Sequence, residues 1–134
     1  MRLPANAHVA VVDGERFLLM RNCGTTAEPK LELEAEPSLE ETNKSAGQRE
    51  HESEHRRWGE PHDRAAHAAA VAEWLNHQVL THRIEQLLVV ADPETLGEMR
   101  RHYHKQTEAA LAGEVHKQLT GMPGPDILKA VVAA

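Results

Sequence analysis

Residues 84–120, with the sequence IEQLLVVADPETLGEMRRHYHKQTEAALAGEVHKQLT, decide which fold this chain is expected to adopt. The apolar run at residues 87–91 is typical of a strand that is buried on both faces. It is followed at once by Asp92-Pro93-Glu94-Thr95, where Asp92 can cap a helix and Pro93 suits its first turn. A buried strand that leads directly into a capped helix is half of a β-α-β unit, so the stretch predicts an α/β protein.

The elements on either side follow from the same kind of pattern. Residues 93–110 predict a helix, residues 114–120 a last strand, and residues 126–132 a terminal helix that Asp126 can cap. Upstream, Val71, Leu75 and Val79 recur every four residues, which predicts an amphipathic helix over residues 64–82.

The first third of the chain predicts strands. Residues 7–12 and 16–21 are apolar runs on either side of Asp13-Gly14, a strong hairpin turn signal. Residues 30–36 alternate apolar and acidic side chains, which fits a half-exposed strand at a sheet edge. The three strands together predict an antiparallel meander.

Residues 38–63 are polar and lack any period, so we expect a mobile loop between the third strand and the first helix. The expected order is therefore β-β-β-loop-α-β-α-β-α. We predict a single three-layer α/β domain over residues 1–134, with a mixed sheet.

Composition narrows the classes of function. The formal net charge of −6 argues against non-specific binding to bulk nucleic acid or to anionic membranes. A single cysteine, Cys23, excludes an intramolecular disulfide and favours a reducing compartment. No apolar stretch is long enough to predict a membrane span, and the N-terminal residues do not resemble a secretory signal. We expect a cytoplasmic protein without a cofactor.

Three separate segments resemble the bacterial host attachment protein family. The stretch Ala91-Asp92-Pro93-Glu94-Thr95-Leu96-Gly97-Glu98-Met99-Arg100 is similar to that family's AxPxxLGxLR motif. The later segment Glu114-Val115-His116-Lys117-Gln118-Leu119-Thr120 is similar to its E(I/V)xKDLT ending, with Gln118 where an acidic residue is common. The early turn Val12-Asp13-Gly14 also fits the family pattern.

This resemblance implies a distant relationship to the middle domain of class-1 translation termination factors. In those factors the loop between the third strand and the first helix carries Gly-Gly-Gln, which reaches the ribosomal peptidyl transferase centre. This chain has Ser45-Ala46-Gly47-Gln48-Arg49 there, and Ala46 resists the backbone angles that a glycine permits. The resemblance thus implies a non-enzymatic host attachment protein that acts through RNA or ribosome contact. The candidate contact residues are Gly47, Gln48, Arg49, Arg56, Arg57, Arg100, Arg101 and Lys105.

Two other functions stay open. The sequence His51-Glu52-Ser53-Glu54-His55 matches the HExxH pattern of zinc hydrolases, so a metal-dependent hydrolase or nuclease is one alternative. Its neighbours are charged and give a helix no apolar stripe, which argues against a rigid site, although Glu73 could be named as a third ligand. The remaining alternative is a protein-interaction module whose loop becomes ordered on binding a partner protein.

Overall fold

The computed structural model describes residues 1–39 and 61–134, with side chains described from residue 64 in the second part. This part of the chain contains a five-stranded sheet and four helices, and the fold is α/β. The strands are β1 (His8–Val12), β2 (Phe17–Asn22), β3 (Leu31–Ala35), β4 (Leu87–Val90) and β5 (Leu111–Val115). The helices are α3 (Pro61–Leu80), α4 (Pro93–Arg100), α5 (Lys105–Ala110) and α6 (Gly124–Ala133).

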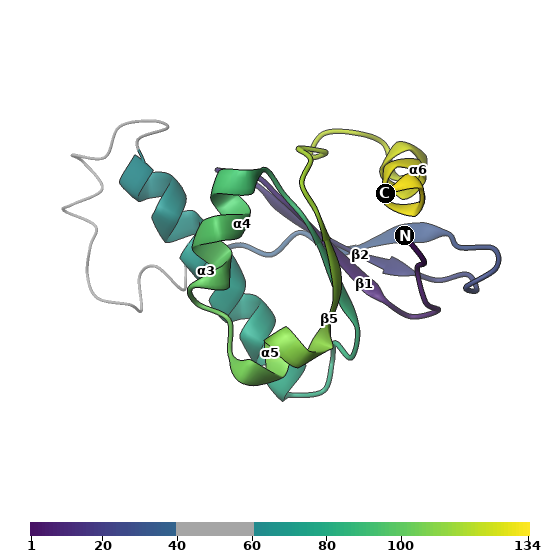
Figure 1. The fold of residues 1–134 in the computed structure, drawn as a ribbon, viewed down its shortest axis with the longest axis horizontal. Coiled ribbons are helices and arrows are strands. Elements are labelled where there is room, and N and C mark those ends of the chain that lie inside the picture. Colours follow the sequence, from purple (N-terminus) through teal and green to yellow (C-terminus); the bar gives the residue numbers. More distant parts are fainter. Residues whose placement is uncertain (40–60) are drawn as a thin grey trace.

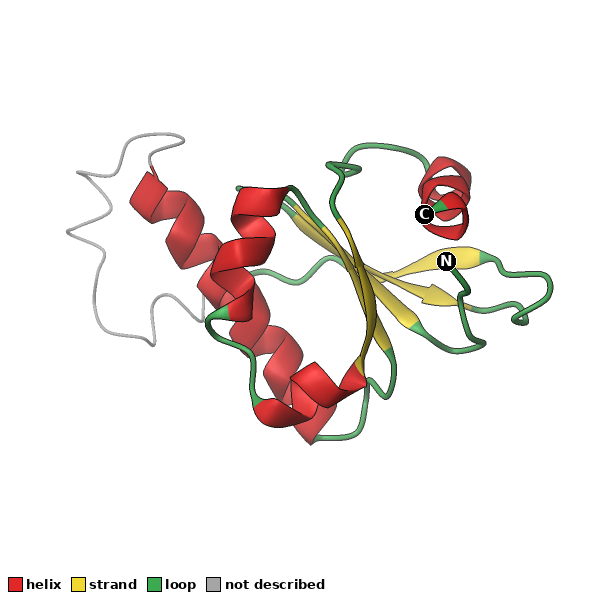
Figure 2. Cartoon of the chain, in the orientation of Figure 1, coloured by secondary structure: helices red, strands yellow, loops and turns green. Residues whose placement is uncertain are grey.

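The sheet is mixed, and its strand order is β3-β2-β1-β4-β5. The first three strands form the predicted antiparallel meander, while β1, β4 and β5 run parallel to one another. Helices α3, α4 and α5 cover one face of the sheet and α6 covers the other, which gives three layers (Figures 1 and 2). The central strands β1 and β4 are buried along their whole length because both of their faces are covered.

Alternation along β1 divides its side chains between two cores. Ala10 and Val12 pack under α3 and α4 with Leu75 and Leu96, in the larger core. Val9 and Val11 pack on the opposite face of the sheet, where α6 supplies Ile127 and Val131 to the smaller core. Side chains alternate between the two faces of a strand and recur about every 3.6 residues on one side of a helix, so apolar side chains cover both faces of the sheet.

The expected turn and the expected edge strand are both present. The backbone N–H of Asp13 donates to the carbonyl oxygen of Arg16 at 3.0 Å and closes the β1–β2 turn. Strand β3 lies at the sheet edge, with Leu33 55 % exposed. Its pairing is irregular, because Leu19 faces Ala35 while the next residue, Met20, faces Leu33. Glu34 is therefore the extra residue of a β-bulge.

The helix predicted over residues 93–110 is wrong in one respect, since it is two helices. Its start is as expected, because the Asp92 carboxylate accepts from the Thr95 backbone N–H at 3.1 Å. Helix α4 ends at Arg100, and α5 begins at Lys105. The side chain of Asn76 on α3 fills the break, donating to the carbonyl oxygen of His102 and accepting from the backbone N–H of His104, both at 2.9 Å. These bonds provide partners for the His102 carbonyl and the His104 N–H at the point where the helix is interrupted.

The last strand also differs from the prediction of residues 114–120. Strand β5 ends at Val115, because its parallel partner β4 ends at Val90 and the chain then turns, with the N–H of Lys117 donating to the carbonyl of Val115 at 3.0 Å. Leu119 is buried in the smaller core without belonging to the sheet. The terminal helix begins at Gly124, two residues before the predicted start, and its N-cap is Pro123 instead of Asp126. The predicted mobile loop at residues 38–63 lies almost entirely outside the described residues.

Candidate functional site

Most residues predicted to contact RNA belong to the segment that joins β3 to α3. Gly47, Gln48, Arg49, Arg56 and Arg57 lie outside the described residues. The structure shows where this segment is attached, since the chain leaves β3 at Ala35 and enters α3 at Pro61. In the order of elements this is the position that carries the ribosome-directed loop in the termination factors named above.

The three remaining cations lie on and after α4. Arg100 is tied to the Glu114 carboxylate on β5, with Nη2 to Oε1 at 2.5 Å and Nε to Oε1 at 3.1 Å. These hydrogen bonds, followed by the negative charge of Glu114, raise the pKa of Arg100 above its ordinary value. A guanidinium paired in this way has less capacity to bind a phosphate, because Glu114 already occupies two of its donors.

Arg101 and Lys105 are more available than Arg100. The side chain of Arg101 is 75 % exposed and meets only the edge of Glu98, at 3.7 Å. Lys105 is exposed at the start of α5 and forms no ion pair with another residue of the described part. An exposed ion pair such as that of Arg101 with Glu98 contributes little energy, so Arg101 can exchange its partner, and Lys105 has no ion pair to lose.

Two pairs of histidines lie close together in the sequence, His51 with His55 and His102 with His104. His51 and His55 lie outside the described residues, and no cluster of three metal-ligating side chains occurs among those that are described. Nε2 of His102 donates to Glu98 at 3.1 Å, whereas Nδ1 of His104 accepts from the backbone N–H of Gln106 at 3.0 Å and caps α5. The two histidines therefore serve separate local roles.

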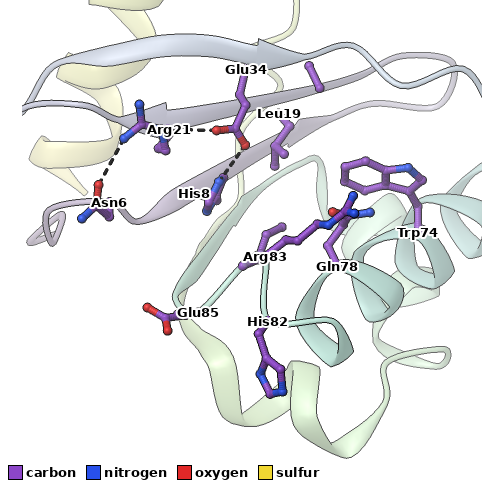
Figure 3. A pocket seen from close by; sticks show the side chains of 12 residues that line it. Asn6, His8, Leu19, Arg21, Glu34, Trp74, Gln78, His82, Arg83 and Glu85 are labelled. Atoms are coloured by element: carbon purple, nitrogen blue, oxygen red, sulfur yellow. Dashed lines mark hydrogen bonds and ion pairs between the residues drawn. The ribbon is translucent and has the colours of Figure 1, made fainter.

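A pocket of about 860 Å³ lies on the α3 face of the sheet, beside the N-terminal end of β1. Its sheet wall is a connected polar network. Nε2 of His8 donates to Oε2 of Glu34 at 2.8 Å, and Nε of Arg21 forms an ion pair with Oε1 of the same carboxylate at 3.2 Å. Nη1 of Arg21 also donates to the side-chain oxygen of Asn6 at 3.1 Å (Figure 3). Glu34 lies on this face because it is two residues after Glu32, which pairs with Arg21, and the bulge brings the next residue, Ala35, onto the same face.

The opposite wall comes from the C-terminal half of α3 and the segment that follows it. Trp74 and Gln78 lie one turn apart on α3, and Figure 3 shows the Arg83 side chain directed toward both of them. The edge-to-face contact between Trp74 and Phe17, with ring centroids 5.3 Å apart, fixes the plane of the indole. Glu85, two residues after Arg83, also lines the pocket.

Two further observations mark this pocket as a site with unusual local structure. The two non-glycine residues with positive φ in the described part are Asn6 and His82, and both line it. His8 is 6 % exposed, and its Nδ1 is buried without a hydrogen-bond partner. Backbone strain, a bulge that redirects a side chain and an unpaired buried polar atom are features that concentrate at binding sites.

The sequence model of bacterial archaeo-eukaryotic release factor family 12 matches residues 6–131. The chain belongs to this family. The match supports the release-factor relationship that the sequence resemblance implied, but it does not confirm the host attachment name. No curated protein sequence matches the chain. None of the described helices combines the length and apolar character that a membrane-crossing segment requires.

Within this family 12 chain, sequence reasoning identified the loop and the cations after α4 but missed the pocket. His8 belonged there only to the apolar run at residues 7–12, and Glu34 was one acidic residue of an alternating strand. One signal was available, because His8 alternates with Ala10 and Val12 and so had to face the same core. A polar side chain in that register needs a partner, and the sequence does not show which one.

Proposed function

We propose that this family 12 protein acts at the ribosome in a release-factor-like role, through contact with ribosomal RNA. The family match over residues 6–131 carries this proposal, together with the place of the β3–α3 segment in the order of elements. Gly47, Gln48 and Arg49 in that segment would approach RNA first. Arg101 and Lys105 would add contacts to phosphates, because they are exposed and lightly paired.

The contact is proposed without peptide-release chemistry. Ala46 replaces the first glycine of the Gly-Gly-Gln motif to which the segment was compared, and alanine restricts the backbone angles available there. The host attachment role implied by the resemblance describes a cellular phenotype, and altered ribosome function is a molecular activity that can underlie it. Only the sequence resemblance supports that finer role.

Co-sedimentation with ribosomes at two salt concentrations tests the proposal. We expect binding at about 50 mM salt that weakens at about 200 mM, because each neutralised phosphate adds about 0.7 to 0.9 to the salt slope. The double variant Arg101→Gln/Lys105→Gln should bind more weakly and reduce that slope by up to about 2. Gln48→Ala should weaken binding without changing the slope, because it removes no charge.

The matched control is Lys129→Gln, which removes one positive charge from α6 on the other face of the sheet. Binding by this variant should equal that of the unmodified protein. The absence of any co-sedimentation at the lower salt concentration would refute the proposal. A peptide-release assay on stalled ribosome complexes separates contact from chemistry, since release by the unmodified protein would contradict the role we assign to Ala46.

A further inference from the structure

We propose that the pocket between β1 and the end of α3 is a binding site for a nucleoside phosphate, either free or as one unit of an RNA strand. Its lining includes Ala35, where the β3–α3 segment leaves β3, but neither Arg101 nor Lys105, and the proposal does not depend on ribosome contact. Its volume of about 860 Å³ falls within the range of about 300–1,000 Å³ typical of small-ligand pockets.

One arginine of the pocket is free to bind an anionic group. On the sheet wall, the Glu34 carboxylate is already neutralised by Arg21 and accepts a bond from His8. On the other wall, Arg83 forms no ion pair with another described residue and extends along the cavity (Figure 3). Glu85 also lines the pocket without an ion pair to a described residue, so the free guanidinium of Arg83 is the group that can bind phosphate oxygens, with paired, charge-assisted hydrogen bonds.

The same wall favours a planar ring beside that anion. The Trp74 indole is half-buried, and Phe17 holds it in one orientation, so it offers a surface on which a base can stack without loss of side-chain freedom. Gln78 follows four residues later on the same side of α3 and brings an amide that can both donate to and accept from a base edge. An aromatic platform next to a free arginine is a combination that suits a nucleotide.

Local backbone strain gives Arg83 its position. Helix α3 ends at Leu80, His82 follows with φ +65°, and the N–H of Arg83 donates to the carbonyl of Gln78 at 2.9 Å. This helix-terminating arrangement usually employs glycine at the residue with positive φ. Here a histidine adopts it, and the chain then turns so that Arg83 lies across from Glu34 instead of continuing along the helix axis.

On the sheet wall, the network prepares the carboxylate of Glu34 as an acceptor. Its Oε2 accepts one hydrogen bond from His8 and its Oε1 forms an ion pair with Arg21, whereas a carboxylate can accept about four hydrogen bonds in total. The remaining capacity can accept a ribose hydroxyl or an exocyclic amino group. Because both its partners are themselves held in the sheet, the carboxylate needs no reorganisation when such a ligand binds.

Fluorescence of Trp74 provides the test. The chain has two tryptophans, so the variant Trp58→Phe leaves Trp74 as the sole indole reporter. AMP, GMP, CMP and UMP are titrated into this protein, and we expect quenching that saturates with at least one of them. The absence of quenching up to about 10 mM, ten times the Kd of a millimolar ligand, overturns the proposal.

A charge variant and a ligand without phosphate then test the assigned contacts. In the Trp58→Phe background, Arg83→Gln should weaken AMP binding about tenfold or more, because it removes a charge-assisted contact. It should leave the weaker binding of adenosine unchanged, and Lys129→Gln should affect neither ligand. Equal AMP binding by Arg83→Gln, or equal loss with Lys129→Gln, contradicts the site.

A tetranucleotide distinguishes the two sources of the ligand. Tighter binding of a tetranucleotide than of its mononucleotide, lost in Arg83→Gln, identifies the site as one for an RNA strand. Binding of the mononucleotide alone identifies a free nucleotide. Because these titrations contain no ribosomes, their failure and the failure of co-sedimentation are independent results.

Discussion

The substitution Asn22→Asp should destabilise the protein strongly, although it changes only one atom type in the side chain. Asn22 ends β2, and its exposed fraction is 0 %. Its Nδ2 donates to three backbone carbonyl oxygens, those of Leu3, Pro4 and Thr25, at 3.2, 3.1 and 3.3 Å. Its Oδ1 accepts from the backbone N–H groups of Gly24 and Lys30, both at 2.9 Å. One side chain thus connects the N-terminal segment to the β2–β3 connection.

The expected loss follows from these contacts. The two N–H groups of Nδ2 share the three carbonyl oxygens. A carboxyl group keeps the two accepted bonds but places an oxygen opposite these carbonyl oxygens, so both donors are lost and the new oxygen is buried without a donor. At about 1 kcal/mol for each bond, with the added cost of the unsatisfied acceptor, the loss is about 3–5 kcal/mol. Because domains of this size unfold at about 5–15 kcal/mol, the variant should be only marginally folded.

Urea unfolding followed by circular dichroism measures this loss. With a slope of about 1–3 kcal/mol per molar urea, the midpoint should fall by about 2 M. The control Gln118→Glu makes the same amide-to-acid change at an exposed position and should alter stability by less than about 0.5 kcal/mol. A loss below about 1 kcal/mol for Asn22→Asp would mean that the five bonds do not hold this end of the sheet together.

Three further predictions concern individual contacts. Tyr103→Phe should raise the free energy of unfolding by about 1 kcal/mol, since the buried hydroxyl has no hydrogen-bond partner, and a lower thermal midpoint would contradict this. His82→Gly should stabilise the protein by up to about 1 kcal/mol in chemical unfolding, because glycine adopts positive φ without strain. The pKa of Asp13 is lowered, because burial raises it less than bonds from the Thr120 hydroxyl and from two backbone N–H groups lower it. A carboxyl with a lowered pKa stabilises the fold at pH values above its ordinary pKa of 3.8, and this stabilisation is lost as the pH falls through the lowered pKa. The destabilisation by Thr120→Val should therefore be full at pH 7 and shrink below about pH 3.8, as measured by a series of unfolding curves.

Features that depend on neighbouring residues were the ones that sequence could predict. Asp13-Gly14 closes the first hairpin, and the Asp13 carboxylate accepts from the backbone N–H groups of Glu15 and Arg16 within the same turn. Asp92 caps α4 through a residue three positions away. The apolar run of β4 is buried on both faces, as its composition indicated. In each case the signal and the structure lie within a few residues of each other.

Features that depend on distant partners were not predictable. The break between α4 and α5 is stabilised by Asn76, which is 26 to 31 residues away from the groups that it binds. Strand β5 ends where its pairing with β4 ends, and the two strands are separated in the sequence by α4 and α5. The pocket joins His8 to Glu34 across 26 residues, and the bulge that brings Ala35 into the same lining is a property of strand pairing and not of composition.

Helix α3 places the pocket far from one of the two ends of the β3–α3 segment. The helix has 20 residues, so at 1.5 Å per residue it is about 30 Å long. The segment joins its first residue, whereas Trp74 and Gln78 lie about 20–25 Å further along its axis. The other end of the segment leaves β3 at Ala35, which lines the pocket. If the segment and the pocket bind the same RNA, each raises the effective concentration for the other. Arg83→Gln should then weaken co-sedimentation by itself and weaken it further when combined with Arg101→Gln/Lys105→Gln, whereas unchanged co-sedimentation of Arg83→Gln would show that the pocket serves a free nucleotide.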